Sequence, residues 1–182
     1  MSLWDRIKAN FYQRALPEKA ARHLGRPPRN LDEARSIAIL FPAGEIDDRK
    51  VVLKYAERLR KQNKSVTLLG YLPVADAEAT FPFTHFTDKE IDWAQRPKGE
   101  GVAKFWGSSY DALVCLFAQS NLPTEMIVLK TPAALKIGPV PQQADTYDLM
   151  LDVSPSTRPQ VIIDHYEKIL ALTKQPKPMK VV

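Results

Sequence analysis

The sequence predicts one α/β domain built on a doubly wound, mostly parallel sheet. Short apolar runs alternate with helical patterns from residue 36 onward, which is typical of βαβ units. The runs are continuously apolar, as in strands buried on both faces. The 182 residues are enough for one sizeable core. We therefore expect a three-layer, Rossmann- or flavodoxin-like body over residues 31–173, with an N-terminal arm at 1–30 and a basic tail at 174–182.

The strands of this sheet are predicted from apolar runs bounded by turn residues. The first run, SIAILFP, ends at Pro42 and is followed by Gly44. The connection between the last two runs is too short for a helical crossover, so we expect that pair to form a hairpin. The predicted strands are 36–42, 65–72, 83–86, 110–117, 134–139 and 147–153.

The helices are predicted from apolar positions three and four residues apart. Val52, Tyr55 and Leu59 fall on one face of the first helix of the body. Pro123 stands in the first turn of another helix, where its missing N–H costs nothing. The predicted helices of the body are 47–63, 99–107, 122–130 and 159–174.

The N-terminal arm carries the whole net charge of +5. Residues 1–30 hold seven basic and two acidic groups, whereas the remaining residues hold 19 of each. Trp4, Ile7 and Phe11 recur at helical spacing, and Lys8 and Arg14 flank this apolar stripe. The arm therefore reads as a basic amphipathic helix that ends before the breaker cluster GRPP.

This arm gives the leading hypothesis for function, a non-enzymatic interaction protein. Its basic helix would contact an anionic or protein partner, such as RNA, an anionic membrane surface, another protein or a second copy of the chain. Two simpler alternatives remain open: the helix packs on its own domain, or the charge only maintains solubility. With no transmembrane run, no signal peptide and the single cysteine Cys115, we expect a cytoplasmic protein.

The alternative hypothesis is a small-molecule-binding or transferase-like enzyme that works at the carboxyl edge of the sheet. Open α/β sheets bind ligands beyond the carboxyl ends of their strands. Here that edge comprises loops 43–48, 71–76, 118–121, 140–145 and 154–158. The candidate ligand-binding residues in these loops are Glu45, Asp47, Ser120, Asn121, Ser156 and Thr157.

The same loops lack the signals of the common cofactor sites. The first loop has one glycine, Gly44, followed by acids, and neither GxGxxG nor GxxxxGK[ST] occurs. We expect no nucleotide, no other cofactor, no metal and no identifiable catalytic residue. Asp47 and Asp48 at a helix start are interpreted as caps rather than as a metal site or general base. Ser154 or Ser156 is expected to cap the last helix, with anion binding as the alternative.

Three stretches resemble a bacterial family of small α/β proteins known as a domain of unknown function. They are 37–72, 81–116 and 134–153, and the more specific parts are the segment TDKEIDW and the strands that begin with Tyr-Asp. The resemblance implies the fold and says little about activity. A fainter similarity to the N-terminal half of heptosyltransferase-like glycosyltransferases, in YDALVCL followed by LKIG, is a likeness of fold that transfers no function.

Overall fold

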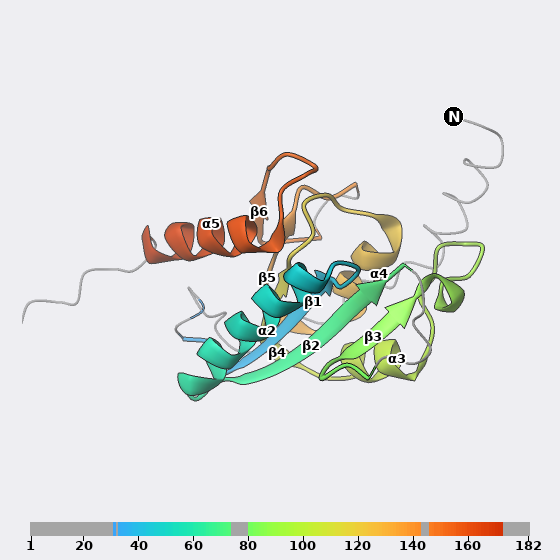
Figure 1. Ribbon diagram of the computed structural model, residues 1–182, viewed down its shortest axis with the longest axis horizontal. Helices are drawn as coiled ribbons and strands as arrows, with labels where there is room; N and C mark the ends of the chain where they lie inside the picture. The colour runs from blue at the N-terminus through green and yellow to red at the C-terminus, as the bar shows by residue number, and fades with distance from the viewer. Residues whose placement is uncertain (1–30, 32, 74–79, 143–145, 173–182) are drawn as a thin grey trace, which may run out of the picture.

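The structure is a computed structural model that describes residues 31, 33–73, 80–142 and 146–172. Six parallel strands form one open sheet in the order β3-β2-β1-β4-β5-β6 (Figure 1), which confirms the predicted α/β fold. The residues predicted to contact a partner, Trp4, Ile7, Lys8, Phe11 and Arg14, lie outside the described residues, as does the tail. The strands are β1 (Ser36–Pro42), β2 (Ser65–Leu72), β3 (Thr84–Thr87), β4 (Tyr110–Cys115), β5 (Ala133–Pro139) and β6 (Leu149–Leu151).

The central strand β1 is buried on both faces, as its continuous apolar run predicts. It pairs in parallel with β2 on one side and with β4 on the other. Ile37 and Ile39 belong to the core on one face of the sheet, and Ala38 and Leu40 belong to the core on the other. Because side chains alternate between the two faces, both must be apolar when helices cover both.

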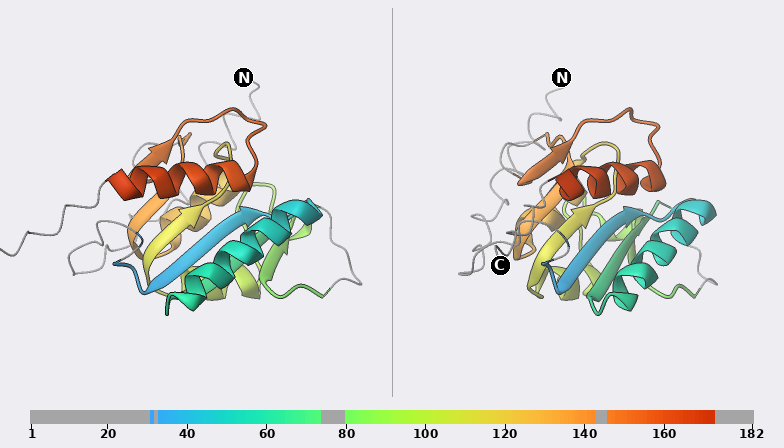
Figure 2. Two further views of the ribbon diagram at one scale, coloured as in Figure 1. Left: turned by 60° about the vertical axis from the view of Figure 1, so that its left-hand side comes forward. Right: turned by 90° about the vertical axis from the view of Figure 1, so that its left-hand side faces the viewer.

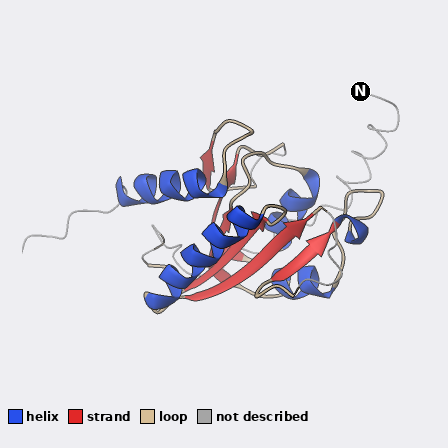
Figure 3. Ribbon diagram, viewed as in Figure 1, coloured by secondary structure: helices blue, strands red, loops and turns tan. Residues whose placement is uncertain are grey.

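Helices cover the two faces in pairs. Helices α2 (Ile46–Lys61) and α5 (Pro159–Leu172) lie side by side on one face (Figure 2), where Tyr55 and Tyr166 join the first core. Helices α3 (Glu100–Trp106) and α4 (Leu122–Lys130) cover the other, where Phe105 and Ile127 join the second. Figure 3 shows the resulting three layers. Within the described residues, no helix is long and apolar enough to span a membrane.

The expected hairpin between the last two strands is wrong. Strand β6 pairs in parallel with β5, and Ile137 faces Leu149 in the register. The intervening chain, residues 140–148, can span about 30 Å when extended. Since β6 has three residues and is therefore only about 10 Å long, a connection of this length can reach the start of a parallel strand without a helical crossover.

The two Tyr-Asp pairs of the sequence act at the amino edge of the sheet, opposite the expected binding edge. One carboxylate oxygen of Asp111 accepts hydrogen bonds from the N–H groups of Arg35 (2.8 Å) and Ser36 (2.9 Å). Asp148 accepts one from the Lys136 N–H at 2.8 Å. Asp111 therefore joins β4 to the start of β1, and Asp148 joins the start of β6 to the middle of β5.

Candidate functional site

The carboxyl ends of all six strands lie at one edge of the sheet, because every pairing is parallel. The direction of winding reverses between β1 and β4, whose connections cross opposite faces of the sheet through α2 and α4. Ligands of open α/β proteins commonly bind at such a reversal. A ligand site is therefore expected in the loops of this edge.

The turn that follows β1 is closed by hydrogen bonds within the protein. The Ala43 N–H donates to the Tyr71 carbonyl at 2.8 Å, and Arg49 Nη1 donates to the Ala43 carbonyl at 2.9 Å. On the neighbouring strand, the Leu116 N–H donates to the Leu40 carbonyl at 2.8 Å. A phosphate-binding loop needs several backbone N–H groups directed at the ligand, and these two are already used inside the fold.

The acidic residues after β1 have separate structural environments. Glu45 and Asp47 are exposed, and Asp47 pairs with Lys50 at 3.6 Å. Asp48 is buried and accepts a hydrogen bond from Arg158 Nε at 2.9 Å, which links the starts of α2 and α5. The N-cap residue of α2 is Glu45, without a side-chain cap, so the capping role expected for Asp47 and Asp48 is wrong. Both lie in the first turn, where the helix dipole favours negative charge.

Ser120 is buried and holds a buried carboxylate in place. Its hydroxyl donates to Glu125 Oε1 at 2.5 Å, and the Gln142 N–H donates to the same oxygen. The Gln142 side-chain amide in turn donates to the Ser120 carbonyl at 3.1 Å. Glu125 is fully buried and thus joins the loop after β4 to the loop after β5. The Ser120 hydroxyl therefore has a structural role, since it donates its proton to Glu125 within the fold.

Asn121 caps helix α4. Its Oδ1 accepts the Thr124 N–H at 3.1 Å, and its carbonyl accepts the Thr124 hydroxyl at 3.0 Å. Pro123 occupies the first turn, as the sequence predicts. The N-terminus of α4 is therefore closed by its own residues.

Ser156 and Thr157 lie in the turn before α5. The Ser154 and Ser156 hydroxyls are 3.1 Å apart and hydrogen bonded, while the Thr157 N–H donates to the Ser154 carbonyl at 2.9 Å. Because α5 begins only at Pro159, the expected serine cap is wrong.

Cys115 is fully buried at the end of β4, as the sequence predicts. Burial raises the pKa of its thiol to about 11. The thiol is therefore protonated at neutral pH and is not a nucleophile.

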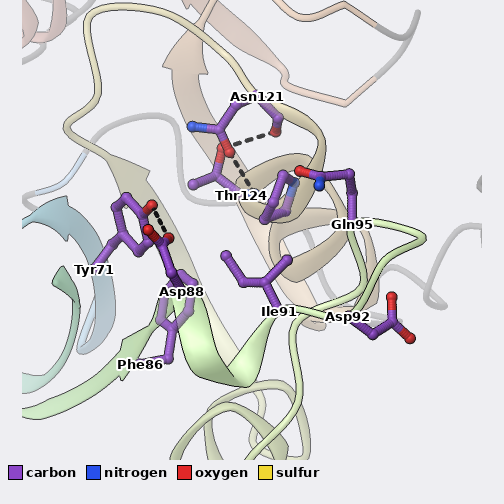
Figure 4. A pocket seen from close by; sticks show the side chains of 9 residues that line it. Tyr71, Phe86, Asp88, Ile91, Asp92, Gln95, Asn121 and Thr124 are labelled. Carbon is purple, nitrogen blue, oxygen red and sulfur yellow. Dashed lines mark hydrogen bonds between the residues drawn. The ribbon is translucent and has the colours of Figure 1, made fainter. Parts of the chain in front are cut away.

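A pocket of about 470 Å³ opens at this edge between the end of β3 and the start of α4 (Figure 4). Its walls come from the ends of β2 and β3, from the loop after β3 and from the first turn of α4. Its volume is in the range of small-molecule sites. The lining residues are Tyr71, Phe86, Asp88, Ile91, Asp92, Gln95, Asn121, Pro123 and Thr124.

Tyr71 and Asp88 form a hydrogen-bonded pair on one wall of the pocket (Figure 4). The phenol of Tyr71 donates to Asp88 Oδ1. Burial, together with this hydrogen bond, raises the pKa of Tyr71 to about 12, so the phenol keeps its proton at neutral pH. The Tyr71 ring also packs against Phe86, with centroids 5.2 Å apart.

The loop after β3 is held by an internal network. Thr87 and Glu90 form a capping box around a single turn of 3-10 helix, Asp88–Glu90. Asp92 accepts hydrogen bonds from the Ala94 N–H (2.9 Å) and from the Arg96 N–H (3.0 Å) and Nε (2.8 Å). Burial alone would raise the pKa of Asp92, but the hydrogen bonds from Arg96, Lys98 and Ala94 outweigh it and lower that pKa. In the segment TDKEIDW, Thr87, Glu90 and Asp92 thus hold the conformation of this loop.

Of the six residues predicted for ligand binding, this pocket contains Asn121 alone. The other five predicted residues lie elsewhere on the carboxyl edge: Glu45, Asp47, Ser120, Ser156 and Thr157.

The other eight lining residues, among them Tyr71, Asp88 and Gln95, are not among the residues predicted from the sequence. Tyr71 opens the predicted edge loop 71–76, whereas the segment TDKEIDW carries no pattern typical of a ligand site. The positive φ of Gln95, 62°, gives the turn its shape, and no local pattern predicts it.

The protein is therefore an α/β domain of Rossmann strand order whose carboxyl edge carries a pocket without a phosphate-binding loop. A family model matches residues 8–172, and the chain belongs to that family, the Family of unknown function (DUF6913). The match confirms the resemblance to an uncharacterised family. No curated protein matches the chain.

Proposed function

We propose that the protein is a non-enzymatic interaction protein, in which the α/β body is a scaffold and the basic arm contacts an anionic or protein partner. One observation about the carboxyl edge supports a non-catalytic body. Several polar groups that chemistry would need there are bonded to one another as structural links: Ser120 to Glu125, Asn121 to Thr124 and Asp48 to Arg158.

Sequence features support the arm as the contact element. It holds the whole net charge of the chain, and Lys8 and Arg14 flank the stripe of Trp4, Ile7 and Phe11. Such a helix suits a surface that is both apolar and anionic, such as phospholipid. RNA would use the same basic groups. The family match begins at residue 8, so much of the arm belongs to the matched unit.

Deletion of residues 1–30 tests this proposal. We expect a folded body by circular dichroism and thermal melting, and loss of co-sedimentation with anionic vesicles or RNA at low salt. The double variant Lys8→Gln/Arg14→Gln should weaken binding. Lys54→Gln/Lys61→Gln, on exposed positions of α2, is the charge-matched control and should not. Unfolding of the truncated body, or unchanged binding, would contradict the proposal.

Titration with ATP, NAD and nucleotide sugars tests the non-catalytic body. We expect no thermal stabilisation by any of them. A ligand at 100 times its dissociation constant would add about 2.7 kcal/mol, which the melting curve would show. Clear stabilisation would favour the enzyme hypothesis.

The pocket favours a second candidate function, the binding of a small polar molecule at the carboxyl edge. Its hydroxyl, carboxylate and amide groups converge on one space next to aromatic rings, as in ligand sites. A screen of small polar compounds by NMR should move the side-chain amide signals of Asn121 and Gln95. Compounds that move only signals elsewhere would argue against a site here.

A further inference from the structure

The carboxylates that line the pocket are Asp88 and Asp92. In the part of the chain that the structure describes, no lysine, arginine or histidine lines it. Asp92 is neutralised by Arg96 Nη2 at 2.8 Å and Lys98 Nζ at 3.3 Å. Asp88 accepts a hydrogen bond from the neutral phenol of Tyr71. Among the described residues, no basic group forms an ion pair with Asp88. Within the described ranges, Asp88 is therefore the pocket carboxylate that remains available to a cationic ligand.

The hydrogen-bonding groups around Asp88 are mainly acceptors. The Tyr71 phenol gives its one proton to Asp88, so the phenolic oxygen can accept a further hydrogen bond. A carboxylate accepts up to about four hydrogen bonds, so the exposed Asp88, which lines the pocket beside Tyr71 (Figure 4), can accept more than the one from the phenol. A ligand that donates hydrogen bonds and carries positive charge matches this end of the pocket.

The opposite wall offers a donor. Asn121 Oδ1 accepts a hydrogen bond from the Thr124 N–H. The amide NH2 of the same side chain can therefore donate hydrogen bonds to a ligand. In Figure 4 this NH2 group is directed toward the side of the pocket where Tyr71 and Asp88 lie. A hydroxyl or carbonyl oxygen of the ligand would be its partner.

The aromatic ring of Tyr71 on the pocket wall also favours a cation. The half-buried ring of Tyr71 lines the pocket and packs on the fully buried ring of Phe86, with centroids 5.2 Å apart. Tyr71 is therefore the ring that a ligand can reach, and aromatic faces attract cations through their quadrupole. An anion is disfavoured at this end of the pocket, because Asp88 repels it and the N-terminus of α4 is capped by Asn121.

We propose that this pocket binds a small organic cation, an alkylammonium group with a neighbouring hydroxyl or carbonyl. The ammonium group lies against Asp88 and Tyr71, and the oxygen accepts from Asn121. This inference rests on the second candidate function, ligand binding in the pocket, and names the class of ligand.

The test is an NMR titration of the full chain with choline, ethanolamine and the neutral carbon analogue of choline, in which carbon replaces the quaternary nitrogen. We expect at least one cation to move the side-chain amide signals of Asn121 and Gln95 at concentrations up to about 10 mM. The carbon analogue should bind at least about tenfold more weakly. Binding should also weaken as salt rises, because Asp88 is exposed.

Asp88→Asn keeps the shape of the side chain and removes its charge. It should weaken cation binding at least about tenfold, whereas Asp47→Asn, on the same edge outside the pocket, should leave it unchanged. Binding of the carbon analogue that is as tight as that of the tighter-binding cation would overturn the cation class while leaving ligand binding intact. Absence of binding by all three compounds would overturn both. If Asp88→Asn fails to fold, the comparison of the cations with the carbon analogue on the unmodified chain still tests the proposal.

Discussion

The ring of Tyr147 covers Gly138 so closely that a Cβ atom on Gly138 would lie 2.1 Å from its Cε1 atom. Gly138 lies in β5, and Tyr147 stands just before β6. The absence of a side chain at Gly138 therefore lets the chain turn back over β5 and enter β6 in parallel.

Gly138→Ala should destabilise the protein by about 1–3 kcal/mol, because the buried ring has to shift within a packed core. Gly44→Ala is the matched control, since its Cβ would meet Pro73 at an ordinary 3.5 Å. Urea unfolding of both variants measures the difference. Equal, small effects would show that Tyr147 does not depend on Gly138.

Ile39→Ala should cost about 2–5 kcal/mol of unfolding free energy. Ile39 is fully buried in the central strand, where its loss leaves a cavity between β1 and the helices. Ile46→Ala, at a residue that is 59% exposed, should change stability by less than about 0.5 kcal/mol. A loss under about 1 kcal/mol at Ile39 would contradict the central position of β1.

Glu125→Ala should destabilise the protein by at least about 2 kcal/mol, because the Ser120 hydroxyl and the Gln142 N–H lose a shared buried acceptor. Glu125→Gln should cost less, since its amide oxygen still accepts. The exposed Glu57→Ala on α2 serves as the control. Thermal melting compares the three, and a tolerated Glu125→Ala would mean that the two loops do not depend on this link.

Asp92 should contribute stability that depends on pH. Its pKa is lower in the folded protein than in the unfolded chain, so its contribution is complete above the ordinary Asp value of about 4. The contribution disappears as the pH falls through the lower folded-state pKa. The stability difference between the wild type and Asp92→Asn should therefore shrink in acid. A difference that stays constant from pH 7 to about pH 2 would contradict this assignment.

The sequence predicts the fold well where a local pattern determines the structure. The apolar run of residues 36–42 and the periodicity of 47–63 correspond to β1 and α2. The parallel pairing of β6 with β5 was not predicted, because a connection too short for a helical crossover can still link parallel strands when the second strand is as short as β6. The direction of that strand depends on how Tyr147 packs, which is a tertiary contact.

The candidate site was harder to predict because it depends on which polar groups pair. Ser120 and Asn121 were correctly expected at the carboxyl edge, but Glu125, which binds Ser120, looks like a solvated residue in the helical pattern of 122–130. The pocket itself depends on the conformation of the loop after β3, where Gln95 adopts a positive φ. Such a turn is stabilised by Asp92 and its partners rather than by local propensity.

The contact of α5 with α2 has a consequence for synthesis of the chain. Arg158, just before α5, binds Asp48 of α2, and Glu167 of α5 binds Arg58 of α2. Helix α5 thereby closes the core on this face of the sheet. While the ribosome is still adding residues before 172, only α2 can cover that face of the nascent sheet, and the part that α5 covers stays open. Apolar side chains such as Val114 and Ile137 are then open to wrong association. The domain therefore completes its fold only when its last helix has left the exit tunnel.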